Sequence, residues 1–90
     1  MPPNKWIISF SKKAEKSLEK IPKKYLKTIL EAIDEMSVDP GLGDVKKMVG
    51  TKNIYRKKVG VYRILFEKYK DILFIDIINV ADRKDIYKIF

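Results

Sequence analysis

The chain has 90 residues and a net charge of +8, with 20 Lys and Arg residues against 12 Asp and Glu residues. It contains no cysteine and no histidine, which excludes disulfides, thiol nucleophiles, histidine-based triads and most metal sites. Any catalysis must use lysine, arginine, tyrosine or carboxylate groups. The length predicts one domain over residues 1–90. No apolar run reaches the roughly 18 residues of a membrane span and no signal peptide is evident, so we expect a soluble, cytoplasmic protein.

The N-terminal half predicts a strand followed by two helices. Residues 5–10 are apolar enough for a strand, and Ser11 suits the N-cap of a helix over about residues 12–20. Pro22 suits the first position of a second helix. This second helix carries an apolar stripe at helical spacing, which predicts burial against a core. The stripe consists of Leu26, Ile29, Leu30, Ile33 and Met36. A connection this short predicts an antiparallel helix hairpin, and residues 39–43 end it.

The C-terminal half predicts a sheet. Residues 54–58, 61–67 and 72–80 are rich in β-branched and aromatic side chains and are separated by turn signals. Residues 82–90 fit either a short helix or a trailing strand. The fold class is therefore α+β: an N-terminal strand, an antiparallel helix hairpin, a three-stranded antiparallel meander joined to the first strand, and a short C-terminal segment.

The positive charge is concentrated in two zones. Residues 1–30 carry eight lysines against Glu15 and Glu19, and residues 46–70 carry nine basic residues against Glu67. Such zones indicate a polyanionic partner, because neutralising phosphates releases their counterions. A lysine-rich solvated surface explains the composition equally well.

The predicted hairpin formed by residues 54–58 and 61–67 favours the interpretation that the partner is a polyanion. If Val59 and Gly60 form a two-residue turn, Arg56 lies directly opposite Arg63. Like charges in that position destabilise a sheet, whereas an anion bound between two guanidiniums would be stabilising. A register differing by one residue, or a neutralising acid from the C-terminal part, would remove this interpretation. Strand alternation places one mostly apolar set toward the helices: Tyr55, Val59, Tyr62, Ile64 and Phe66. The opposite face carries Ile54, Arg56, Lys58, Arg63 and Leu65.

The element order, the segment at 55–63 (YRKKVGVYR) and the segment at 81–87 (ADRKDIY) together resemble the RelE/ParE toxin superfamily. The resemblance covers essentially the whole chain and is strongest to its RelE-type messenger-RNA interferases. It implies a RelE-like fold and the toxin of a type II toxin–antitoxin pair. The implied activity is metal-independent, ribosome-dependent cleavage of mRNA in the ribosomal A site, in which the 2′-hydroxyl attacks the adjacent phosphate.

The same resemblance implies the site residues. Arg63 matches the central phosphate-binding arginine, and Arg56 and Lys58 match two basic residues on the preceding strand. Arg83 matches an arginine after the last strand, and Tyr87 the C-terminal tyrosine, which would stack on a base or transfer a proton. Without histidine, a lysine beside arginines is a candidate general base, which nominates Lys58.

Two of these assignments have structural alternatives. Arg83 could instead form a salt bridge with Asp82 or Asp85, and Tyr87 could simply pack against the edge of the sheet. The lysines of the N-terminal zone could form a solvated face or dock on ribosomal RNA. They are Lys12, Lys13, Lys16, Lys20, Lys23, Lys24 and Lys27.

The partners implied are a cognate acidic RelB-like antitoxin, the ribosome and mRNA, with no cofactor and no metal. The surface around Tyr25 and Leu26 is a candidate groove for an amphipathic antitoxin helix. Two other functions fit the same fold: a ParE-like toxin directed at DNA gyrase, and a non-catalytic member that binds nucleic acid or antitoxin.

Overall fold

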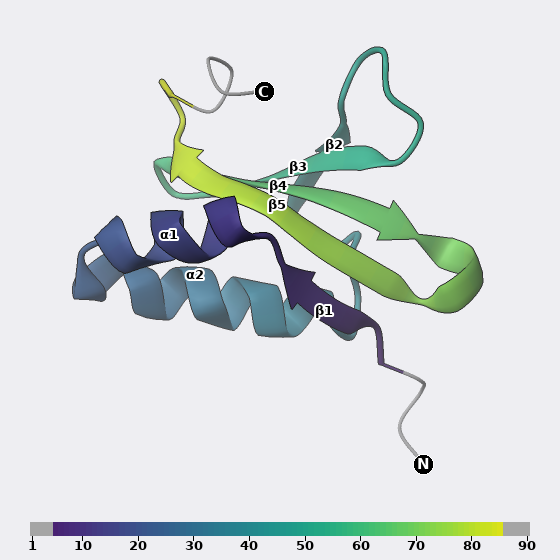
Figure 1. The fold of residues 1–90 in the computed structure, drawn as a ribbon, viewed down its shortest axis with the longest axis horizontal. Coiled ribbons are helices and arrows are strands. Elements are labelled where there is room, and N and C mark those ends of the chain that lie inside the picture. Colours follow the sequence, from purple (N-terminus) through teal and green to yellow (C-terminus); the bar gives the residue numbers. More distant parts are fainter. Residues whose placement is uncertain (1–4, 86–90) are drawn as a thin grey trace.

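A computed structural model describes residues 5–85 of the chain. Its strands form a single five-stranded sheet in the order β1-β5-β4-β3-β2, with β1 parallel to β5 and the other pairs antiparallel (Figure 1). The elements in chain order are β1 (Ile7–Phe10), α1 (Lys12–Lys20), α2 (Lys23–Met36), β2 (Asp44–Lys47), β3 (Ile54–Val59), β4 (Tyr62–Tyr69), the 3₁₀ turn η1 (Lys70–Ile72) and β5 (Phe74–Asp82). The predicted α+β fold is confirmed.

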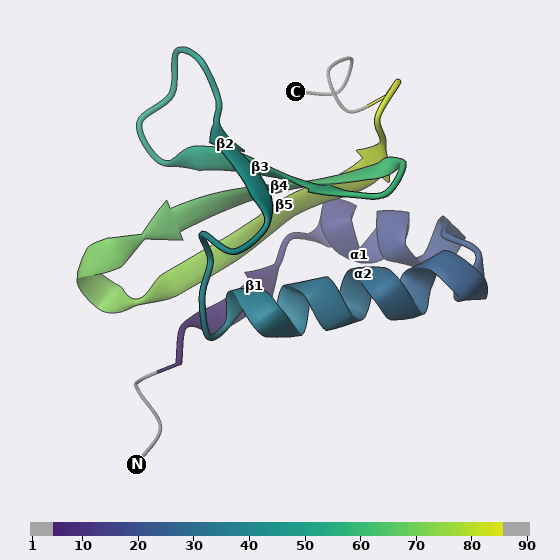
Figure 2. The same cartoon turned by 180° about the vertical axis from the view of Figure 1, so that it is seen from behind.

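The two helices lie side by side on one face of the sheet, as the views from opposite sides agree (Figures 1 and 2). Ser11 caps α1 as predicted, because its Oγ accepts a hydrogen bond from the Ala14 backbone N–H at 3.0 Å. Pro22 is the N-cap of α2 rather than its first helical residue. Its carbonyl accepts bonds from the backbone N–H groups of Tyr25 and Leu26.

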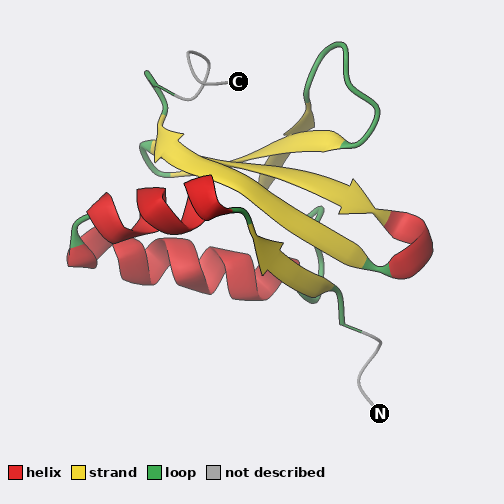
Figure 3. Cartoon of the chain, viewed as in Figure 1, coloured by secondary structure: helices red, strands yellow, loops and turns green. Residues whose placement is uncertain are grey.

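The core lies between the helices and the sheet, which form two layers (Figure 3). From α2, Ile29, Ile33 and Met36 are buried against Phe66 of β4 and Ile77 of β5. Each such side chain contributes on the order of 1.5–3 kcal/mol when fully buried. Leu30, which the sequence places in the same stripe, is instead 45% exposed. No helix among the described residues is long and apolar enough to cross a membrane.

The sheet has one strand more than the sequence predicts. Strand β2 is only four residues long and three of them are charged, so it gives no alternating apolar signal. Its pairing comes from β3, along which it forms the sheet edge. Buried Lys57 of β3 also donates from Nζ to the Leu42 carbonyl at 2.9 Å, which fixes the segment leading into β2.

The predicted register of the β3–β4 hairpin is wrong by two residues. Val59 pairs with Tyr62, so the turn consists of Gly60 and Val61. Gly60 has φ 59°, and a positive φ at the first central position is what a type II′ hairpin turn requires of glycine. Arg56 therefore pairs with Leu65, not with Arg63.

A two-residue shift leaves every side chain on its predicted face. The side chains of Tyr55, Val59 and Tyr62 accordingly pack on the core, in which Ile64 and Phe66 are buried. The sheet face opposite the helices, here called the distal face, keeps the basic residues predicted for it.

Candidate functional site

Cationic side chains from three neighbouring strands share the distal face. Residues paired directly across strands lie on the same face of a sheet. One cross-strand row runs Asp44–Lys58–Arg63–Ala81, and the next runs Lys46–Arg56–Leu65. We call the four cations of these rows the distal basic cluster: Lys46, Arg56, Lys58 and Arg63.

Arg63 is the best-anchored cation of the cluster. It is only 7% exposed, and its Nη1 donates to the carbonyls of Gly60 at 2.9 Å and Tyr62 at 3.0 Å. Its Nε and Nη2 form no hydrogen bond with any described residue. The hairpin turn therefore fixes the plane of the guanidinium while leaving donors that suit an oxyanion.

Lys58 lies directly opposite Arg63 and is exposed. The sequence predicts that Arg56 lies opposite Arg63. In the structure a like-charge pair does form across the hairpin, but the residue opposite Arg63 is Lys58. Because Lys58 is the residue nominated as general base, the observed register puts it beside the predicted phosphate-binding arginine.

Arg56 has an acidic neighbour that sequence reasoning missed. Its Nη2 lies 3.9 Å from Oδ1 of Asp44, and the Arg56 side chain is 13% exposed against 48% for Asp44. The acid beside Arg56 thus comes from β2, and not from the C-terminal part of the chain, which was the alternative that the sequence suggests. Asp44 is also the direct cross-strand neighbour of Lys58, so a single carboxylate lies beside two cations.

Arg83 lies at the same end of the sheet. Its backbone N–H donates to the Val61 carbonyl at 2.7 Å, which attaches the segment after β5 to the turn that anchors Arg63. The Arg83 side chain is exposed and makes no ion pair with Asp82 or Asp85 within the described chain. Instead, Oδ1 of Asp82 accepts a hydrogen bond from the backbone N–H of Lys84. Tyr87 lies outside the described residues.

The lysines proposed to dock on RNA form a separate surface. They belong to α1 and α2, on the other side of the sheet from the distal basic cluster, and all seven are exposed. The structure therefore does not bring them into the site. It adds instead Lys46, which β2 supplies and which was missed because β2 was not predicted.

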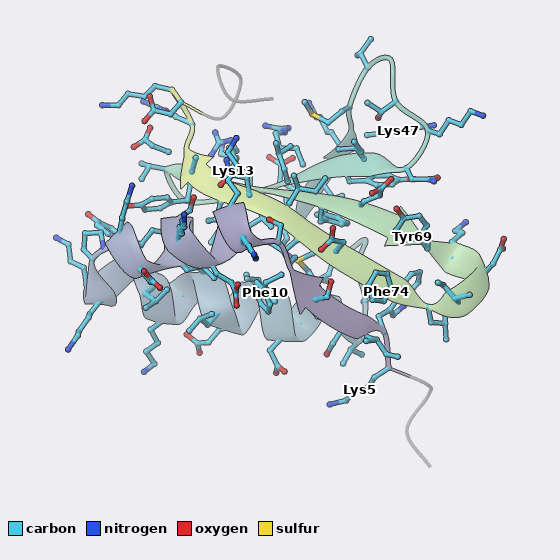
Figure 4. The ribbon with its side chains drawn as sticks, viewed as in Figure 1. Lys5, Phe10, Lys13, Lys47, Tyr69 and Phe74 are labelled. Atoms are coloured by element: carbon cyan, nitrogen blue, oxygen red, sulfur yellow. The ribbon has the colours of Figure 1, made fainter. Side chains whose placement is uncertain are left out.

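Aromatic side chains gather at the far end of the sheet. Tyr69 and Phe74 lie beside each other across the β4–β5 connection, with ring centroids 5.9 Å apart (Figure 4). Hydrogen bonding to Glu67 raises the pKa of Tyr69 above its usual 10.0, with smaller contributions from burial and nearby acidic charge. This cluster is not part of the basic site.

These features define a small protein whose sheet carries a buried, hydrogen-bonded arginine and exposed lysines on the face opposite its helices. The chain belongs to the family described as the ParE toxin of type II toxin–antitoxin systems, whose model matches residues 8–87. It is a type II toxin of the RelE/ParE superfamily.

Solved structures support the same placement. The chain is 35% identical to a chain of the RelB–RelE antitoxin–toxin complex of Methanococcus jannaschii, covering 91% of this chain and 98% of that one with a TM-score of 0.75. For the archaeal RelE–RelB complex of Pyrococcus horikoshii, the identity is 26%, the coverage 88% and 96%, and the TM-score 0.77. Among curated proteins, RelE1 of Methanocaldococcus jannaschii is 26% identical over 87 residues, covering 93% of this chain and 97% of that protein.

Proposed function

We propose that this toxin is a metal-independent endoribonuclease that cleaves mRNA in the ribosomal A site. The observation that carries the proposal is the direct opposition of Lys58 and Arg63 on the distal face, with Arg56 in the adjacent row. Three cations at adjacent positions of two paired strands favour the binding of a phosphate.

The proposed chemistry divides among these side chains. The RNA 2′-hydroxyl attacks the adjacent phosphorus, and the bond to the 5′-oxygen breaks. Arg63, already oriented by the Gly60 and Tyr62 carbonyls, stabilises the charge that grows on the phosphorane oxygens. Lys58 takes the 2′-hydroxyl proton, and Tyr87 stacks on a base or protonates the leaving oxygen. Arg56 and Arg83 hold the flanking negative charge.

The partner that inhibits the toxin would be an acidic RelB-like antitoxin. A groove between α2 and the β3–β4 hairpin is lined by Tyr25, Thr28 and Ile29 on one side and by residues 59–62 on the other. Tyr25 is 40% and Val61 44% exposed, which suits the apolar face of an amphipathic helix. An antitoxin helix there would contact the turn that orients Arg63. The relatives from M. jannaschii and P. horikoshii were solved in complex with RelB.

Docking on the ribosome is assigned to the exposed lysines of the helices, mainly those of α1. Ribosomal RNA offers a dense array of phosphates, which such lysines bind without reading sequence. This arrangement leaves the distal face free for mRNA.

Induced expression followed by mapping of mRNA 5′-ends tests the proposal. We expect cuts in phase with codons for the wild type, and their loss in the Lys58→Met variant. Lys46→Ala and Lys47→Ala form a matched pair, because these neighbours on β2 pair with Arg56 and Tyr55 and so point to opposite faces. Lys46→Ala should weaken cleavage and Lys47→Ala should not. Wild-type cleavage by Lys58→Met would contradict the site.

The description of the matching family favours a second candidate, a ParE-like toxin that acts on DNA gyrase. The same expression experiment separates the two, because this candidate predicts a DNA-damage response without codon-phased cuts. Growth arrest with neither signal would favour a non-catalytic binding protein.

A further inference from the structure

The charges of α2 run against its helix dipole. Lys23 and Lys24 occupy the first turn, while Asp34 and Glu35 lie at the other end, and neither terminal turn contains a charge of the favourable sign. A helix N-terminus favours anions and a C-terminus favours cations. This arrangement weakens the isolated helix, and no ion pair with another described residue offsets it.

A groove follows the outward side of the same helix. Leu26 and Leu30 provide its apolar floor, and Leu30 is 45% exposed. Lys23 and Lys27 line one end of the groove, and the acidic residues Glu31, Asp34 and Glu35 line the other end. None of these five charged side chains forms an ion pair with another described residue.

We propose that this groove is a homodimer interface, in which α2 of a second copy packs antiparallel across a two-fold axis. A two-fold interface brings the same surface together twice, so it must be complementary to itself. With the axis passing near residues 28 and 29, Lys23 faces Asp34 of the second copy and Lys27 faces its Glu31. Leu26 and Leu30 then meet their counterparts near the axis.

Charge balance favours a second copy over an acidic partner. The helix carries Lys23, Lys24 and Lys27 against Glu31, Asp34 and Glu35, so its net charge is zero in a chain of +8. Two copies can therefore approach through this surface without the repulsion that the basic surfaces would cause. An acidic helix would be repelled by the acidic end of the groove.

The dimer also agrees with the layered fold. Helix α2 belongs to the helix layer, and the distal basic cluster lies on the opposite side of the sheet (Figure 1). The antitoxin groove proposed above uses Tyr25 and Thr28, on another side of α2. The dimer would therefore present two basic faces directed away from each other. A single helix face is a small contact area, so we expect weak, reversible association.

Reciprocal charge exchange tests the interface. Sedimentation equilibrium of the full chain from about 10 µM to about 1 mM should show association for the wild type. Lys23→Glu and Asp34→Lys each place like charges together twice per dimer, so each should raise the dimer dissociation constant about tenfold. Combining the two exchanges restores opposite charges and should restore association to within about threefold of the wild type.

The same exchanges distinguish an interface effect from misfolding. Each of them puts a favourable charge at its end of α2, so thermal stability of the monomer should not fall. Lys70→Glu makes the same change in net charge as Lys23→Glu, but at an exposed turn far from α2, and should leave association unchanged. Val61→Glu, in the other groove, should also leave it unchanged.

Three results would overturn the proposal. One is a wild-type chain that stays monomeric over the whole concentration range. Another is failure of the double exchange to restore association lost in the single variants. The third is loss of association in Val61→Glu instead, which would move the interface to the other groove. None of these results depends on whether the toxin cleaves RNA.

Discussion

Lys58 and Arg63 face each other across β3 and β4, although both are cationic. Such a pair costs a sheet about 0.2–1 kcal/mol. Asp44, on the other side of Lys58, offsets only part of this repulsion because it also lies beside Arg56. The two members of the pair differ in freedom: Arg63 is buried and bonded to a turn, whereas Lys58 is exposed. That combination suits one group that binds and another that moves a proton.

Substitution of Arg63 should affect both stability and activity. Arg63→Ala removes the donor to the Gly60 and Tyr62 carbonyls, so the free energy of unfolding should fall by about 1–3 kcal/mol. RNA cleavage on translating ribosomes should fall at least about a hundredfold. Urea unfolding and 5′-end mapping measure the two effects. Lys58→Met is the comparison variant. Because the Lys58 side chain is exposed, this substitution should lower cleavage with little change in the free energy of unfolding. Folded Arg63→Ala protein that cleaves at the wild-type rate would contradict our assignment.

The strongly patterned elements could be predicted from the sequence. The apolar spacing of α2, the cap at Ser11 and the alternation along β3 and β4 each reflect a local rule that packing then reinforces. The faces of the hairpin were correct although its register was not, because a shift of two residues preserves alternation.

What escaped prediction depends on how strands pair with one another, and not on the pattern within one segment. Strand β2 has no apolar pattern of its own and forms only because β3 offers an edge. Asp44 and Lys46 therefore could not be assigned to the site. The place of Gly60 in the turn was also ambiguous, since glycine serves at either central position of different hairpin turns.

Asp44 should act as an internal competitor for RNA phosphate. Its carboxylate lies 3.9 Å from Arg56 and opposite Lys58. Asp44→Asn removes this charge with little change in shape, so single-stranded RNA should bind several-fold more tightly. The slope of log K against log salt should steepen by about 0.7. Asp71→Asn, an exposed carboxylate in the β4–β5 connection, is the control for net charge. Equal effects of the two substitutions would show that Asp44 has no special role.

The lysines of α1 should contribute to ribosome binding without contributing to the chemistry. Lys16→Ala and Lys20→Ala remove exposed charges from the helix layer. Each should lower the salt dependence of ribosome binding by roughly one unit of slope. Cleavage at saturating ribosome concentration should stay within about twofold of the wild type. Loss of cleavage at saturation would place these lysines in the site after all.

Tyr69 should make the stability of the far end of the sheet sensitive to alkaline pH. Hydrogen bonding to Glu67 raises the pKa of Tyr69 in the folded state, because the neutral phenol is the form that donates to the carboxylate. A raised pKa contributes stability that is complete below the unfolded value of 10.0 and is lost as pH rises through the folded value. Wild-type protein should therefore be more stable than Tyr69→Phe near neutral pH, and the difference should shrink above about pH 10. Glu67→Gln removes the charged acceptor and should reduce this pH dependence of stability. Because it leaves every lysine in place, it separates the effect of Tyr69 from a general effect of lysine titration. Chemical unfolding at a series of pH values measures the difference, and a gap that stays constant into the alkaline range would refute this account of Tyr69.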